Sequence, residues 1–167
     1  RALGLGLPLI ARALSGARAL SPHRMDVRGL RIGAVPLTII DDSYNANIDS
    51  MRAAVAALEA IGKGRRTIAV LSEMLELGED SPATHRAVGA MLSGAGVDAL
   101  IGLGRDAHYY SEGAASVPDR VLVEDPGAAL AAVLDRLTDD CVVLVKGSYN
   151  SYSWQVADGL LEEATTR

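Results

Sequence analysis

The chain has 167 residues, of which 49% are hydrophobic, and it carries 16 basic and 21 acidic residues for a net charge of −5. This length supports one domain with its own core, and the acidic balance argues against a nucleic-acid-binding surface. The single cysteine, Cys141, cannot form an internal disulfide, and three scattered histidines lack zinc-ligand spacing. No metal ligands are therefore predicted among the side chains.

The first twenty residues are apolar but include Arg12 and Arg18, so they contain neither a long uncharged run nor the layout of a signal peptide. A helix is predicted over residues 7–14. Residues 21–32 are interpreted as a linker followed by a short strand, with a domain boundary near Pro22. A cytoplasmic protein is expected.

Short apolar runs without strict alternation are typical of strands that are covered on both faces. Such runs occupy residues 37–40, 67–71, 99–101, 121–123 and 142–145. Between and after them, helical spacing predicts helices over residues 51–61, 84–95, 105–115, 128–137 and 154–163. Asp49 and Ser50 are the predicted cap of the first helix, and Ser81 with Pro82 is expected to begin the second.

Alternating strands and helices predict the α/β class, specifically a Rossmann-like three-layer domain with a mostly parallel sheet. Ligands bind such sheets at the carboxyl ends of the strands. The segments to inspect are therefore residues 41–47, 72–80, 102–106, 124–125 and 146–153. A phosphate-binding loop is not evident, because residues 62–67 lack its spacing and precede a strand, and they are interpreted as a turn.

Polar side chains occupy six of the seven positions from 41 to 47, directly after a predicted strand. A carboxylate at this position can accept hydrogen bonds from a ribose diol, and asparagine side chains can both donate and accept toward a base. The same residue types also favour turns and helix N-caps. Composition alone leaves both interpretations open.

Four motifs in order along the chain resemble the C-terminal third of the Mur ligases. They are Ser-Pro-His-Arg-Met at 21–25, Asp-Asp-Ser-Tyr-Asn-Ala-Asn at 41–47, Met-Leu-Glu-Leu-Gly at 74–78, and Val-Lys-Gly-Ser at 145–148. The resemblance is strongest to the family member that uses ATP and magnesium to add D-alanyl-D-alanine to UDP-N-acetylmuramoyl-tripeptide. It implies that residues 1–21 are the tail of a central ATPase domain and a linker, and that residues 22–167 are the C-terminal domain. Without the central domain, which would hold most of the magnesium, the chain is expected to be inactive.

The resemblance also implies roles for individual residues. Arg24 would reach the ATP phosphates, Asp42 would hold the ribose hydroxyls, and Asn45 and Asn47 would lie against the adenine or its sugar. Judged by residue type alone, Arg24 could instead be an ordinary solvated linker arginine.

A second group of residues would form the pocket for the incoming amino component: Lys146, Ser148 and Tyr149, with Glu73 approaching from the neighbouring strand end. A lysine that ends a buried strand can instead cap it by bonding a carbonyl. The remaining ring side chains are expected to be structural: His85 packs or caps a helix, Trp154 anchors the last helix, and Tyr109 and Tyr110 lie at a helix surface or edge.

Departures from the family pattern leave the accepted amine open. The family usually has Gly-Asp-Met where this chain has Ser-Glu-Met at 72–74, and Asn-Pro-Asp where it has Asn-Ile-Asp at 47–49. Tyr149 replaces an arginine, and a phenol cannot bind a carboxylate with two parallel hydrogen bonds as a guanidinium does. Another Mur-type or polyglutamate-type ligase, or a non-catalytic nucleotide-binding module, therefore remains an alternative.

Overall fold

The computed structural model describes residues 6–9, 21–138 and 140–166. Six strands form one sheet: β1 (Asp26–Ile32), β2 (Val35–Asp42), β3 (Arg66–Ser72), β4 (Ala99–Leu103), β5 (Asp119–Val123) and β6 (Cys141–Lys146). The helices are α2 (Ile48–Ile61), α3 (Ser81–Gly94), α4 (Ala107–Gly113), α5 (Pro126–Leu134) and α6 (Trp154–Thr166), with 3₁₀ turns at Gly78–Asp80 and Tyr149–Ser151. Within this part of the chain, no helix is long and apolar enough to cross a membrane.

The strand order is β1-β2-β6-β3-β4-β5. Only the β1–β2 hairpin is antiparallel, and the other four pairings are parallel. The α/β class and the mostly parallel sheet are thus confirmed. The predicted short strand after the linker is in fact a seven-residue edge strand, paired along its whole length with β2.

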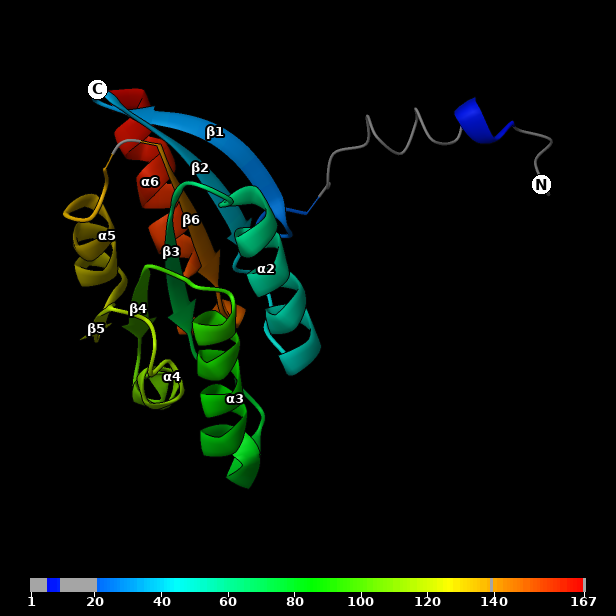
Figure 1. Ribbon diagram of the computed structural model, residues 1–167, viewed down its shortest axis with the longest axis vertical. Helices are drawn as coiled ribbons and strands as arrows, with labels where there is room; N and C mark the ends of the chain where they lie inside the picture. The colour runs from blue at the N-terminus through cyan, green and yellow to red at the C-terminus, as the bar shows by residue number, and fades with distance from the viewer. Residues whose placement is uncertain (1–5, 10–20, 139, 167) are drawn as a thin grey trace.

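Helices cover both faces of the sheet, which produces three layers (Figure 1). One core joins α2, α3 and α4 to one face, and a second core joins α5 and α6 to the other. Because successive strand residues point to opposite faces, Ile40 belongs to the first core and Ile39 to the second. Central strands therefore need apolar residues on both faces, as residues 68–71 of β3 and 141–145 of β6 show.

Most predicted elements are found with shifted ends. The helix after β2 begins earlier than expected because Asn47, not Asp49 or Ser50, is its N-cap: Asn47 Oδ1 accepts from the Ser50 backbone N–H at 2.8 Å, and Ser50 Oγ accepts from the Asn47 N–H at 3.0 Å. Ser81 does begin α3, with Pro82 in its first turn. Residues 7–9 are helical, and the rest of the predicted 7–14 helix lies outside the described residues.

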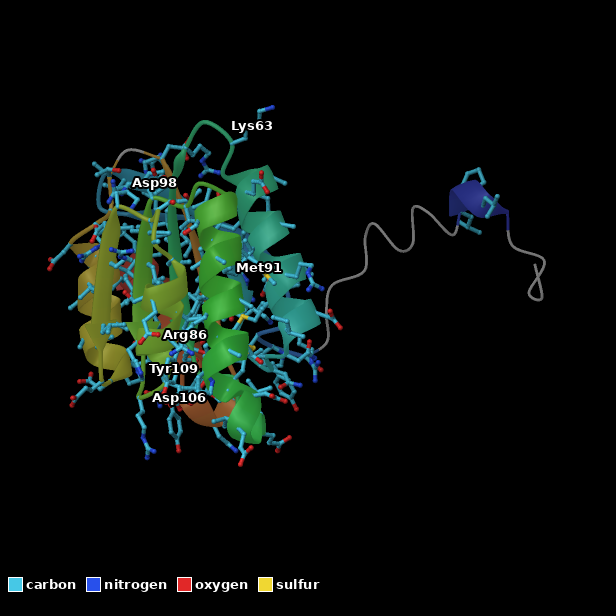
Figure 2. The ribbon with its side chains drawn as sticks, turned by 60° about the horizontal axis from the view of Figure 1, so that its bottom comes forward. Lys63, Arg86, Met91, Asp98, Asp106 and Tyr109 are labelled. Carbon is cyan, nitrogen blue, oxygen red and sulfur yellow. The ribbon has the colours of Figure 1, made fainter. Side chains whose placement is uncertain are left out.

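The prediction for Tyr110 is wrong. Its side chain is fully buried between α4 and the sheet, and its hydroxyl donates to the Ser72 carbonyl at 2.9 Å. Burial raises the pKa of Tyr110 well above its usual value. Tyr109 is only partly buried and lies beside Arg86 of α3, whose guanidinium carbon is 4.7 Å from the centre of the ring (Figure 2).

Candidate functional site

The principal cleft lies at the carboxyl ends of three neighbouring strands, β2, β6 and β3. It has a volume of about 910 Å³ and is lined by residues 44–47, 75–77 and 148–150 together with Pro22, His23 and Trp154. The chain leaves β2 and β3 toward helices on one face and leaves β6 toward α6 on the other. The loops therefore diverge on either side of β6, which is where open α/β sheets bind ligands.

Lys146 and Asp42 form a buried ion pair at the floor of this region. The parallel register of β2 and β6 pairs these two residues, which end their strands on the same face. Lys146 Nζ lies 2.5 Å from Asp42 Oδ2, 2.9 Å from the Asn45 carbonyl oxygen and 3.4 Å from that of Asp42. The lysine side chain is only 1% exposed, and Lys146 does not line the cleft. Its ammonium thus holds the loop after β2.

Both consecutive aspartates fasten the linker to the sheet. Asp41 Oδ2 is 2.8 Å from His23 Nδ1, and Asp42 Oδ1 accepts from the Met25 backbone N–H at 3.0 Å. His23 and Met25 have φ values of 62° and 47°, in the left-handed region that side chains other than glycine rarely adopt. The linker turn is therefore held in an uncommon conformation, with Arg24 between these two residues.

Arg24 lies over the ring of Tyr44, with its guanidinium carbon 3.8 Å from the ring centre. This cation–π contact uses the flat face of the guanidinium and leaves its N–H donors at the edge available. The structure thus brings Arg24 to the cleft residue Tyr44, and Arg24 remains exposed.

Aromatic rings form one wall of the cleft. Tyr149 stacks on Trp154 at a centroid distance of 5.7 Å and an interplanar angle of 11°, and it meets Tyr44 at 5.7 Å and 48°. Tyr149 is 48% exposed, whereas the Trp154 indole Nε1 is buried without a hydrogen-bond partner among the described residues. Only an anchoring role is predicted for Trp154 from the sequence, but its ring also lines the cleft.

Asn45 and Asn47 both line the cleft, but each amide oxygen already has a local partner. Asn45 Oδ1 accepts from the Ala46 N–H at 2.8 Å, and Asn47 is the N-cap of α2. The N-cap and nucleotide interpretations of this segment are compatible, because capping uses the oxygen of an asparagine amide and leaves its NH₂ group as a donor.

The residues predicted for the amine pocket are divided between two clefts. Ser148 and Tyr149 line the principal cleft, and Ser148 Oγ accepts from the Leu75 N–H at 3.1 Å. Glu73 instead lines a neighbouring cleft of about 420 Å³ near the ends of β4 and β5. There its Oε1 accepts from the Asp106 N–H at 2.9 Å. Only the later part of the loop after β3 therefore reaches the principal cleft.

His85 supports that loop from beneath. It is fully buried, and its Nε2 accepts from the Met74 N–H at 3.1 Å while Nδ1 lies 2.7 Å from the Ser81 carbonyl oxygen. Burial lowers the pKa of His85, outweighing the opposing effect of the Ser81 carbonyl. The neutral imidazole, with its proton on Nδ1, matches both bonds. This is the packed histidine that the sequence favours.

The side chains of this cleft suit an aromatic, hydrogen-bonding ligand better than a metal ion. Within the described ranges, no group of three or more His, Cys, Asp or Glu residues could hold a metal. Stacking rings beside amide donors are the features that bind a nucleobase.

Comparison with known proteins agrees with the motifs. A family model described as Mur ligase, glutamate ligase domain, matches residues 23–149. The UDP-N-acetylmuramoyl-tripeptide–D-alanyl-D-alanine ligase of Mycobacterium leprae is 36% identical over an alignment of 182 positions, gaps included, that covers 98% of this chain and 35% of that protein. The enzyme of the same name from Mycobacterium tuberculosis H37Rv is 38% identical over an alignment of 183 positions that covers 97% of this chain and 35% of that enzyme.

Solved structures show the same fold. A crystal structure of MurF from Acinetobacter baumannii matches with a TM-score of 0.78 and 27% identity, over 96% of this chain and 35% of that one. MurF from Thermotoga maritima, in complex with ADP, has a TM-score of 0.68 at 22% identity, over 95% and 37% of the two chains, and at that identity supports the fold alone. This chain spans about 35% of the curated relatives that it matches. It belongs to the Mur ligase family and corresponds to the C-terminal domain of MurF-type ligases.

Proposed function

We propose that this chain is the C-terminal domain of a cytoplasmic, ATP-dependent ligase that adds D-alanyl-D-alanine to UDP-N-acetylmuramoyl-tripeptide in peptidoglycan synthesis. The main support for this proposal is the 36–38% identity to UDP-N-acetylmuramoyl-tripeptide–D-alanyl-D-alanine ligases across 97–98% of the chain. Residues 1–21 would be the tail of the preceding ATPase domain. Because the phosphate loop and magnesium ligands would lie in that domain, the chain alone is expected to be inactive.

In the proposed reaction ATP phosphorylates the tripeptide carboxylate, the dipeptide amine attacks the resulting acyl phosphate, and ADP and phosphate leave. Catalysis of this kind depends on positioning and on neutralising anionic oxygens. This domain would contribute Arg24, whose guanidinium edge is available for phosphate oxygens. Closure of the cleft against the ATPase domain would exclude water from the acyl phosphate.

The nucleotide base and sugar would occupy the principal cleft. Asp42 lies beneath it, and each of its carboxylate oxygens has one close partner, Lys146 or the Met25 N–H. A carboxylate oxygen accepts two hydrogen bonds, so capacity for a ribose hydroxyl remains. The amides of Asn45 and Asn47 would face the base, with Tyr44 supplying a ring for stacking.

The dipeptide would bind along the loop after β6, which separates the two clefts. Ser148 and Tyr149 face the first cleft, and Glu73 faces the second. The second cleft also contains Arg105, an exposed guanidinium without an ion pair among the described residues. Because Tyr149 cannot bind a carboxylate as an arginine does, Arg105 would supply the guanidinium for the dipeptide carboxylate.

Asp42→Ala in the full-length parent enzyme tests the nucleotide assignment. It should raise the KM for ATP by roughly 10-fold or more, the scale of one charge-assisted hydrogen bond, and change the KM for D-alanyl-D-alanine much less. Asp49→Ala is a matched control, because Asp49 is exposed on α2 and its side chain bonds only Arg52 among the residues that the structure describes. An Asp42→Ala enzyme with an unchanged KM for ATP would refute the ribose assignment.

A further inference from the structure

Lys146 ends β6 at the point where the nucleotide side and the amine side of the site meet. We infer that Lys146 is a positioning residue, which fixes the loop after β2 for the nucleotide and does not itself contact the incoming dipeptide. The inference rests on the proposed function for the identity of the two ligands. The contacts that carry it belong to the chain itself.

Every donor of Lys146 is already engaged. The residue is fully buried, and its ammonium lies within 3.4 Å of three oxygens: the Asp42 carboxylate, the Asp42 carbonyl and the Asn45 carbonyl. An ammonium has three N–H donors, so these acceptors account for all of them. A substrate carboxylate would have to displace one of these oxygens and would bring a second negative charge beside the Asp42 carboxylate, both of which are unfavourable.

The three oxygens define the part of the molecule that Lys146 holds. These oxygens belong to Asp42 and Asn45, which lie at the two ends of a short turn, and Asn45 lines the cleft. The other carboxylate oxygen of Asp42 accepts from the Met25 N–H, one residue from Arg24. Lys146 thus directly holds Asp42 and Asn45, the residues proposed to bind the ribose and the base. Through Asp42 it also holds the linker next to Arg24.

The register of the sheet explains why a lysine is suited to this position. Parallel pairing sets Asp42 beside Lys146 at the ends of adjacent strands. The Asp42 side chain is only 17% exposed. Without the lysine, its carboxylate would therefore be a largely buried charge with no counter-ion, which is destabilising. Tyr149 and Ser148, by contrast, lie beyond the strand and keep their own contacts.

Lys146→Met in the full-length parent enzyme tests this role, because methionine keeps an unbranched stem and removes the ammonium. The KM for ATP and the affinity for ADP should weaken by roughly 10-fold or more, the scale of charge-assisted hydrogen bonds. The KM for D-alanyl-D-alanine, measured with saturating ATP, should stay within about 2-fold, the margin expected where no charge-assisted contact is lost. Lys63→Met is the matched control, because Lys63, the only other lysine, is exposed in the turn before the amino end of β3, whereas the cleft lies at the carboxyl ends of the strands. Figure 2 shows Lys63 at the opposite end of the molecule from Asp106.

A second variant keeps the test decisive if Lys146→Met fails to fold. Lys146→Met with Asp42→Asn removes the stranded carboxylate at nearly constant volume, which relieves the buried charge. Since both substitutions break the same contact, the double variant should weaken ATP binding no more than the stronger single variant. Thermal unfolding of each variant identifies any loss of the fold itself.

Two results would overturn the inference. One is a raised KM for the dipeptide with an unchanged KM for ATP, and the other is fully additive effects of the two substitutions on ATP. A wild-type parent that binds ADP but never consumes D-alanyl-D-alanine would instead defeat the proposed function. The ADP affinities of the variants would still decide the role of Lys146.

Discussion

Gly147 and Ser72 pack as a complementary pair beneath the loop after β6. A Cβ added at Gly147 would lie 1.6 Å from Ser72 Oγ and 2.9 Å from Ser72 Cβ. Ser72 is fully buried and its hydroxyl is 2.6 Å from Ser151 Oγ, so it has little room to move. Gly147→Ala therefore forces either Ser72 or the loop itself to shift.

The cost follows from the size of the clash. Overpacking by one methyl group in a filled core costs about 1–3 kcal/mol. For a domain of this size each kcal/mol lowers the Tm by about 2–4 °C, so Gly147→Ala should lower it by about 2–12 °C. Differential scanning calorimetry of the chain measures this directly.

Ser72→Gly provides the matching rescue, because it removes both clashing atoms. It costs some stability alone, through the lost hydrogen bond and a glycine in a strand. In that background, however, Gly147→Ala should cost much less, since the remaining close atom is Ser153 Oγ at 2.8 Å, a side-chain tip without a hydrogen-bond partner among the described residues. An equal loss of Tm in both backgrounds, or no loss with Ser72 present, would refute this explanation.

Three further predictions concern the site and its support. Arg24→Ala in the full-length parent should lower kcat by about 10²-fold, the scale for one preorganised donor to developing charge, and normal turnover would make Arg24 a solvated linker residue. Tyr149→Arg should leave the dipeptide KM equal or lower, and steady-state kinetics that show a higher KM would remove Tyr149 from that pocket. Because burial lowers the pKa of His85 below its ordinary 6.5, its stabilising contribution should be complete above pH 6.5 and decline as pH falls through the lowered value. Wild-type Tm should therefore fall more steeply below pH 6.5 than that of His85→Gln, and parallel curves would contradict this.

The fold could be predicted well because its signals are local. The apolar runs of β3 and β6 have no strict alternation, which indicates strands covered on both faces. The position of the ligand site, in the loops at the carboxyl ends of these strands, could then be predicted. The β1 strand was harder to predict. Val27 is exposed and the strand pairs on one side only, so its pattern carries little of the buried signal. The cap of α2 was predicted at Asp49 and Ser50 rather than at Asn47, because all three residue types favour helix N-caps.

The site was less predictable because it depends on register and strand order. That Lys146 would be neutralised by Asp42 follows from the pairing of β2 with β6, which joins residues 104 positions apart. Glu73 was grouped with Ser148 by motif, yet the side chain turns toward Asp106 and the neighbouring cleft. The burial of Tyr110 similarly required knowing that α4 packs against α3 and the sheet.

The identity of the amine substrate distinguishes the proposed ligase from its relatives, and one assay of the full-length parent enzyme decides it. Phosphate release from ATP should be measured with UDP-N-acetylmuramoyl-tripeptide and a panel of amines that includes D-alanyl-D-alanine, single D-amino acids and L-glutamate. We expect release that depends on D-alanyl-D-alanine, together with a muramoyl-pentapeptide product. Release with another amine, and none with D-alanyl-D-alanine, would show that the proposed function is wrong.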